Sequence, residues 1–90
     1  MSTREQRLTL VYALIALADG YVEEVPPIAK WIAQDKDGEW YWYEKEPTLS
    51  ENEEMWTNVP PNVQRAEGYE YGAVGVGNIP KDYRQEAYEL

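Results

Sequence analysis

Apolar residues recur every three or four positions across residues 8–18, which predicts an N-terminal α-helix. One stripe along this helix is formed by Leu8, Val11, Tyr12, Ile15 and Ala18. A second stripe beside it is formed by Leu10, Leu14 and Leu17. Together the stripes wrap most of the helix, so we expect it to be buried on more than one side. A sheet could cover one side, and a helix from a second copy of the chain could cover the other.

Residues near both ends of this helix are typical of helix termini. Ser2 and Glu5 fit a capping box, in which the hydroxyl and the carboxylate each accept a free backbone N–H. Gly20 is suited to end the helix. Pro26 and Pro27 then favour an extended connector, because proline cannot continue a helix.

The clearest pattern in the chain predicts a β-hairpin. Two strand-like runs, at 28–34 and 39–44, flank the turn sequence Asp-Lys-Asp-Gly at 35–38. A three-residue loop with Gly38 in the left-handed conformation fits this spacing and introduces a bulge. The second strand is unusually aromatic, so both of its faces should take part in packing.

The turn also fixes the register of the hairpin. It predicts that Ile32 faces Trp42 and that Trp31 faces Tyr43, and each such pair contributes roughly 0.2–1 kcal/mol. Alternation along the second strand then places its four aromatic residues on two faces: Trp40 and Trp42 on one, Tyr41 and Tyr43 on the other. We expect the helix to cover one face, and the C-terminal third or a partner to cover the other.

The remainder of the chain predicts three further elements. Ser50 and Glu53 form a second capping-box pattern, which favours a short helix through Trp56. Alternating Tyr and Val residues predict a glycine-rich, twisted or bulged strand over residues 68–77. The tail 81–90 predicts a short helix with one side formed by Tyr83, Ala87 and Leu90. The predicted fold is one α+β domain, residues 1–90, in which the N-terminal helix packs on an antiparallel sheet of three to four strands, with a short C-terminal helix.

Composition narrows the functional classes. The 90 residues carry a net charge of -9 and include four Trp and eight Tyr but no Phe, which predicts a core built on aromatic residues. The absence of Cys and His removes the usual zinc ligands and the commonest general base. The apolar run 8–18 is too short to span a membrane. We therefore expect a cytoplasmic, non-enzymatic protein with no cofactor and no metal.

Negative charge is concentrated between residues 35 and 54. This segment holds eight acidic residues against Lys36 and Lys45, and so six of the nine net negative charges. Carboxylates on a rigid scaffold can imitate nucleic-acid phosphates and occupy a basic groove of another protein. The alternative is an acidic surface that serves solubility. The predicted partner-binding residues are Asp35, Asp37, Glu39, Trp40, Trp42, Glu44, Glu46, Glu51, Glu53 and Glu54.

Other chemistry fits the sequence less well. A calcium loop around Asp35 and Asp37 would need its first ligand at Ala33, which has none to offer. The glycines at 72–77 lack the Lys-Ser/Thr of a nucleotide-binding loop. The aromatic strand could stack on bases, but Glu39 and Glu44 flank it, which disfavours direct nucleic-acid binding. No catalytic residues are predicted.

The sequence resembles small acidic accessory proteins of tailed bacteriophages. The similar features are the run 31–40, the aromatic strand after it, Trp56 and the ending at 82–90. They cover about half of the chain and do not include the N-terminal helix. The resemblance implies a host-takeover or anti-defence role in the host cytoplasm, such as inhibition of a nuclease, a restriction enzyme, a CRISPR effector or a polymerase.

We therefore expect an inhibitor that binds a host protein through a basic surface of that protein. Two other classes stay open. One is an oligomeric sponge that sequesters a nucleotide signal, with Arg65, Lys81 and Arg84 beside an aromatic pocket. The other is a small virion or assembly protein. A homo-oligomer is compatible with each of these classes, because a second copy would enlarge a small core.

Overall fold

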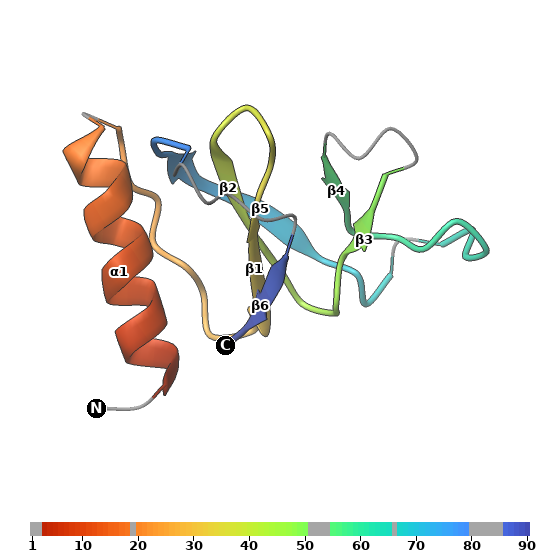
Figure 1. Ribbon diagram of the computed structural model, residues 1–90. Coiled ribbons are helices and arrows are strands. Elements are labelled where there is room, and N and C mark those ends of the chain that lie inside the picture. Colours follow the sequence, from red (N-terminus) through yellow and green to blue (C-terminus); the bar gives the residue numbers. More distant parts are fainter. Residues whose placement is uncertain (1–2, 19, 51–54, 66, 80–85) are drawn as a thin grey trace.

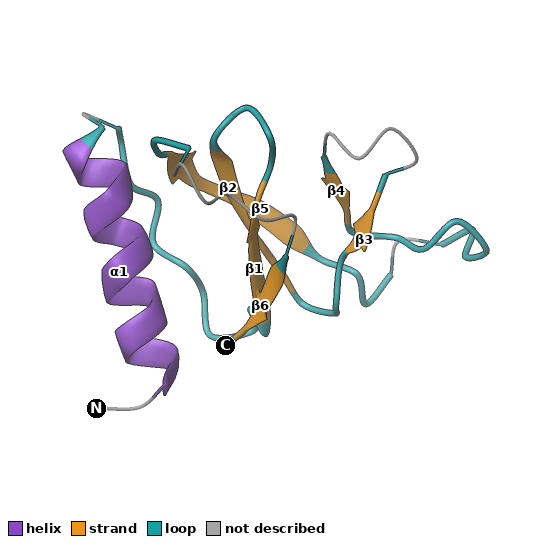
Figure 2. Ribbon diagram, in the orientation of Figure 1, coloured by secondary structure: helices purple, strands orange, loops and turns teal. Residues whose placement is uncertain are grey.

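The computed structural model describes residues 3–18, 20–50, 55–65, 67–79 and 86–90. Its elements are α1 (Thr3–Leu17), β1 (Trp31–Gln34), β2 (Glu39–Tyr43), β3 (Thr48–Leu49), β4 (Trp56–Thr57), β5 (Tyr71–Val76) and β6 (Ala87–Glu89). The helix lies along one side of the main sheet, and the small β3–β4 ribbon lies at the other end of the molecule (Figures 1 and 2). The predicted α+β class is confirmed. Within the described residues, no helix is both long enough and apolar enough to cross a membrane.

The helix is fastened to the connector that follows it. The Arg4 guanidinium donates hydrogen bonds to the carbonyls of Pro26 (2.8 Å) and Ala29. The Gly20 N–H donates to the Ile15 carbonyl at 2.9 Å, which satisfies one of the carbonyls left free at the end of the helix. The predicted helix and its end near Gly20 are thus confirmed, whereas Ser2 of the predicted N-terminal cap lies outside the described residues.

The predicted hairpin and its register are confirmed. Trp31 pairs with Tyr43 and Ile32 pairs with Trp42. Gly38 has a φ of 98°, the left-handed conformation that favours glycine. Its N–H donates to the Asp35 carbonyl at 3.0 Å, while the Asp35 N–H donates to the Glu39 carbonyl at 2.8 Å. These two bonds close the three-residue loop.

The main sheet is antiparallel, with strand order β5-β2-β1-β6. The predicted C-terminal helix is wrong where the structure describes the tail, because Ala87–Glu89 form strand β6 and pair with β1. Backbone groups at the open edge of β1 offer this segment partners, and an isolated helix of this length is marginal in water. Tyr83 of the predicted helix lies outside the described residues.

Strand β5 confirms the predicted glycine-rich, bulged strand. Its pairing with β2 shifts register between Trp40 and Tyr41. The glycines leave room for large neighbours: a Cβ on Gly72 would lie 2.5 Å from the Trp42 indole nitrogen, and one on Gly75 would lie 2.9 Å from an Ile15 methyl carbon. The strand thus lets the helix and the tryptophan approach its backbone closely.

The core lies between α1 and the facing side of the main sheet. Its buried members include Val11 and Ile15 from the helix and Ile32, Trp40 and Val74 from the strands. On the opposite face Tyr43 is also buried, and its ring stacks on Tyr71 with centroids 6.2 Å apart. The chain therefore packs on both faces of the sheet, as the alternation of aromatic residues along β2 predicts.

The predicted helix from Ser50 through Trp56 is also wrong at its described end. Trp56 belongs to strand β4, which pairs antiparallel with β3. The Ser50 N–H donates to the Met55 carbonyl at 2.9 Å, and the Ser50 hydroxyl accepts the Met55 N–H at 3.3 Å. Ser50 thus bonds the residue that precedes β4, and Glu53 lies outside the described residues.

Candidate functional site

The hairpin turn gathers three carboxylates. Oxygens of Asp35, Asp37 and Glu39 lie within 4.8 Å of one another. The turn itself produces this arrangement, because the left-handed Gly38 reverses the chain between the acidic residues. The Asp37 carboxylate accepts the Glu39 N–H at 3.0 Å, which holds it on the turn. We call these three residues the acidic turn.

Asp35 is the buried member of the acidic turn, with 8% of its surface exposed. Its carboxylate accepts the Trp56 N–H at 2.8 Å, so it ties the turn to strand β4. Burial raises the pKa of Asp35, the Trp56 hydrogen bond opposes that rise, and the negative charges of Asp37 and Glu39 add to it. The ionised carboxylate is therefore held in a setting that disfavours its charge.

Glu39 is oriented by a neighbouring tyrosine. The Tyr41 hydroxyl donates to a Glu39 carboxylate oxygen at 2.6 Å. This hydrogen bond, together with burial and the nearby carboxylates, raises the pKa of Tyr41 to about 12. Tyr41 consequently stays protonated at neutral pH and keeps the Glu39 carboxylate in one position.

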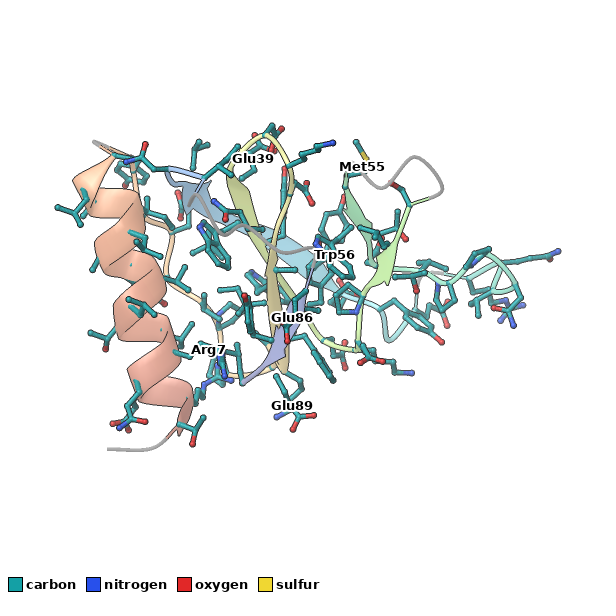
Figure 3. The ribbon with its side chains drawn as sticks, in the orientation of Figure 1. Arg7, Glu39, Met55, Trp56, Glu86 and Glu89 are labelled. Carbon is teal, nitrogen blue, oxygen red and sulfur yellow. The ribbon has the colours of Figure 1, made fainter. Side chains whose placement is uncertain are left out.

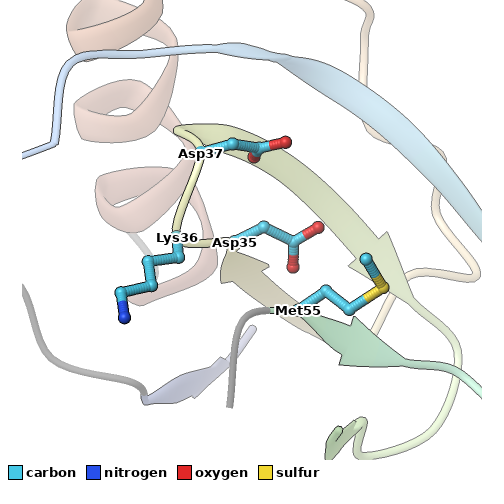
Figure 4. A pocket seen from close by; sticks show the side chains of 4 residues that line it. All are labelled: Asp35, Lys36, Asp37 and Met55. Carbon is cyan, nitrogen blue, oxygen red and sulfur yellow. The ribbon is translucent and has the colours of Figure 1, made fainter. Parts of the chain in front are cut away.

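A pocket of about 290 Å³ opens beside the acidic turn and is lined by Asp35, Lys36, Asp37 and Met55. Figure 4 shows the Asp35 and Asp37 carboxylates on the same side as the Met55 thioether, while the Lys36 ammonium points away from them. Met55 is half exposed, and Figure 3 shows it at the same end of the molecule as Glu39. The pocket therefore joins an apolar wall to carboxylates.

This combination suits a cationic side chain better than a metal ion. The aliphatic stem of an arginine or lysine could pack on Met55 while its charged group reaches the carboxylates. Calcium takes six to eight oxygen ligands, and the acidic turn brings three carboxylates together, one of which already accepts the Trp56 N–H. The acidic turn is therefore an anionic cluster beside a pocket with one apolar wall.

The structure separates the other residues predicted to bind a partner. Trp40 is buried in the core, and Trp42 packs against that core, so both indoles stabilise the fold. Glu44 and Glu46 follow β2 at the end remote from the turn, roughly 17 Å along an extended strand. Glu51, Glu53 and Glu54 lie outside the described residues.

Two residues of the site were not predicted from the sequence. Met55 lines the pocket because the β3–β4 ribbon brings it to the hairpin turn, and nothing local in the sequence signals that contact. Tyr41 donates a hydrogen bond to Glu39, and the alternation of charged and aromatic residues at 39–41 is the sequence signal that could have suggested it.

The raised pKa of Asp35 predicts that removing its charge stabilises the protein at neutral pH. The pKa of Asp35 is higher in the folded state than the value of 3.8 expected for the unfolded chain. Protonated Asp35 therefore contributes its full stability below about pH 3.8, and this contribution is lost as the pH rises through the folded-state pKa. Replacement by asparagine keeps an acceptor for the Trp56 N–H and removes the charge. We expect D35N to unfold at higher denaturant concentration than the wild type at pH 7, with a smaller difference at pH 3.5.

Chemical denaturation at the two pH values measures this effect, with D37N as the control because Asp37 is exposed. A D35N variant that is less stable than the wild type at pH 7 would contradict the account.

The fold and the site together define a small α+β domain with three clustered carboxylates beside a pocket. Comparisons with family models, with curated proteins and with solved structures find no match to the chain.

Proposed function

We propose that this protein is a non-enzymatic binder of a protein partner that presents a basic surface. In the setting implied by the bacteriophage resemblance, it is a stoichiometric inhibitor of a host protein such as a defence nuclease, a CRISPR effector or another nucleic-acid enzyme. One observation carries the proposal: the acidic turn holds three carboxylates within 4.8 Å of one another beside a pocket with the exposed Met55.

The electrostatics of the site favour such a partner. Three neighbouring carboxylates on a chain of net charge -9 attract a basic surface over long range and speed its association. The same charges repel nucleic acid, so the proposal excludes direct binding of DNA or RNA. In a basic groove the carboxylates would take the positions of phosphates.

Preorganisation is the second support. Asp35, Asp37 and Glu39 are each fixed by a hydrogen bond inside the protein, to the Trp56 N–H, the Glu39 N–H and the Tyr41 hydroxyl respectively. Side chains that are already ordered lose less conformational entropy when a partner binds. The partial desolvation of Asp35 also strengthens its attraction to an incoming cation, because less water screens the charge.

The partner is expected to supply the inserted side chain. Trp40 is buried in the core and Trp42 is partly buried against it, so neither indole projects freely as an anchor. The pocket at Met55 instead offers a cavity for an arginine or lysine of the partner, the kind of residue that carries a large share of binding energy when it is buried.

The test is a capture experiment from bacterial lysate at about 50 mM and about 500 mM salt, conditions that differ strongly in charge screening. Native mass spectrometry of the captured complex gives its stoichiometry. The proposal expects a fixed-stoichiometry complex with a basic protein at low salt, which D37N/E39Q weakens. E23Q/E24Q is the matched control, because it removes two exposed charges from the connector. Equal capture by both variants would reject the acidic turn as the site.

A further inference from the structure

The outward face of α1 has no use in the fold or in the proposed site. Figure 1 shows the helix at the edge of the molecule, with the sheet on one side of it only. Its inward residues Val11 and Ile15 are buried, whereas Leu10 and Leu17 are 61% and 78% exposed. Leu14, the third leucine of the second apolar stripe, is partly buried against the core. We call the exposed residues Leu10, Ala13 and Leu17 the outer stripe.

The outer stripe is unusual for its lack of charge. The eleven residues 8–18 contain no Asp, Glu, Lys or Arg in a chain of which 28% is charged. The helix cations lie before this run and are directed elsewhere: Arg4 binds carbonyls of the connector, and Arg7 lies over the Tyr88 ring at 4.8 Å. A solvated helix face normally carries charged residues.

We propose that the outer stripe is the contact surface for a second copy of this chain. A symmetric contact places each surface against itself, so most of the surface of a molecule with net charge -9 would repel its own copy. The outer stripe is uncharged, so a contact there brings no like charges directly together. A basic partner, in contrast, would gain no electrostatic attraction here.

The spacing of residues also suits a self-contact. In an antiparallel pair with the twofold axis between positions 13 and 14, Leu10 lies opposite Leu17 of the second copy, and Ala13 lies beside the axis. The exposed Ala13 near the axis lets the helices approach closely. The antiparallel arrangement also pairs the helix dipoles favourably.

The size of the surface predicts a weak dimer. A helix of 15 residues is about 22 Å long and about 10 Å wide, so its footprint is about 220 Å² on each copy, or about 440 Å² in total. That area is below the roughly 1,200–2,000 Å² of stable complexes. Because the two copies repel each other overall, salt should strengthen this association. Binding at the acidic turn has the opposite salt dependence, so either proposal can fail without the other.

Sedimentation velocity of the full chain at about 10 and about 500 µM, a range suited to weak interfaces, tests the proposal. We expect the mass to rise from the monomer's 10.5 kDa towards twice that value at the higher concentration, and more so at high salt. L10Q/L17Q should stay monomeric, and the matched control I28Q/I79Q, which changes two exposed apolar residues outside α1, should still dimerise. A monomer throughout, or a dimer unchanged by L10Q/L17Q, would overturn the proposal.

Cross-linking supplies a readout that does not depend on how the leucine variants fold. The chain has no cysteine, so A13C introduces a single thiol close to the proposed axis. We expect A13C to form an interchain disulfide at least tenfold faster than K36C, whose thiol lies on the hairpin turn. Equal rates for the two variants would place the contact elsewhere.

Discussion

Replacing Trp40 by alanine is expected to destabilise the protein by about 3–5 kcal/mol, the range for truncating a buried aromatic residue. The indole is 7% exposed and belongs to the core cluster with Val11, Ile15 and Val74. Since small domains have about 5–15 kcal/mol of stability in total, W40A should be close to unfolding. Denaturant titration followed by circular dichroism measures the loss.

Two further variants test whether this loss of stability comes from packing. Within the described residues, the Trp40 indole N–H is buried without a hydrogen-bond partner, so W40F should retain most of the stability. M55A should change stability by less than about 0.5 kcal/mol, as expected for an exposed side chain. If W40A remained as stable as the wild type but lost partner binding, Trp40 would be an interface residue, as the sequence interpretation proposed.

Neutralising Asp37 and Glu39 together is expected to weaken binding of a basic partner by roughly 10- to 100-fold at low salt, because close charge pairs at interfaces contribute more than exposed pairs do. The D37N/E39Q variant should fold normally. Asparagine at position 37 can still accept the hydrogen bond from the backbone N–H of residue 39, and glutamine at position 39 can still accept the one from the Tyr41 hydroxyl. The two substitutions also remove charge repulsion within the acidic turn.

Isothermal titration calorimetry against the captured partner at two salt concentrations measures this loss. The variant should show a shallower salt dependence than the wild type, because fewer charges are screened. The control E23Q/E24Q has the same change in net charge and should lose less than about threefold, as expected for remote charges. Equal losses in the two variants would mean that net charge alone drives binding.

The hairpin could be predicted in detail because its determinants are local. The sequence from Asp35 to Gly38 specifies the turn, and alternation along β2 then specifies which face each aromatic residue occupies. The errors fell where long-range pairing overrides local preference. Ser50 resembles a helix cap but bonds Met55 just before strand β4, and the tail has a helical spacing but pairs with β1.

The candidate site was predicted in part for the same reason. The three acidic residues of the turn lie within five positions of one another, so a turn alone brings them together. The burial of Asp35 and the wall formed by Met55 depend on the β3–β4 ribbon, whose position no local pattern indicates. Trp40 and Trp42 could not be separated from interface residues by sequence, because core and interface aromatic residues have the same composition.

Methionine methyl NMR tests the acidic turn most directly, because the chain has two methionines and Met55 lines the pocket. Titration with a short arginine-containing peptide at about 50 mM salt, where screening is weak, should shift the Met55 methyl signal saturably and leave that of Met1 in place. The shift should disappear in D37N/E39Q and persist in E23Q/E24Q. A Met55 signal that does not move, or that moves equally in both variants, would contradict the proposed docking site.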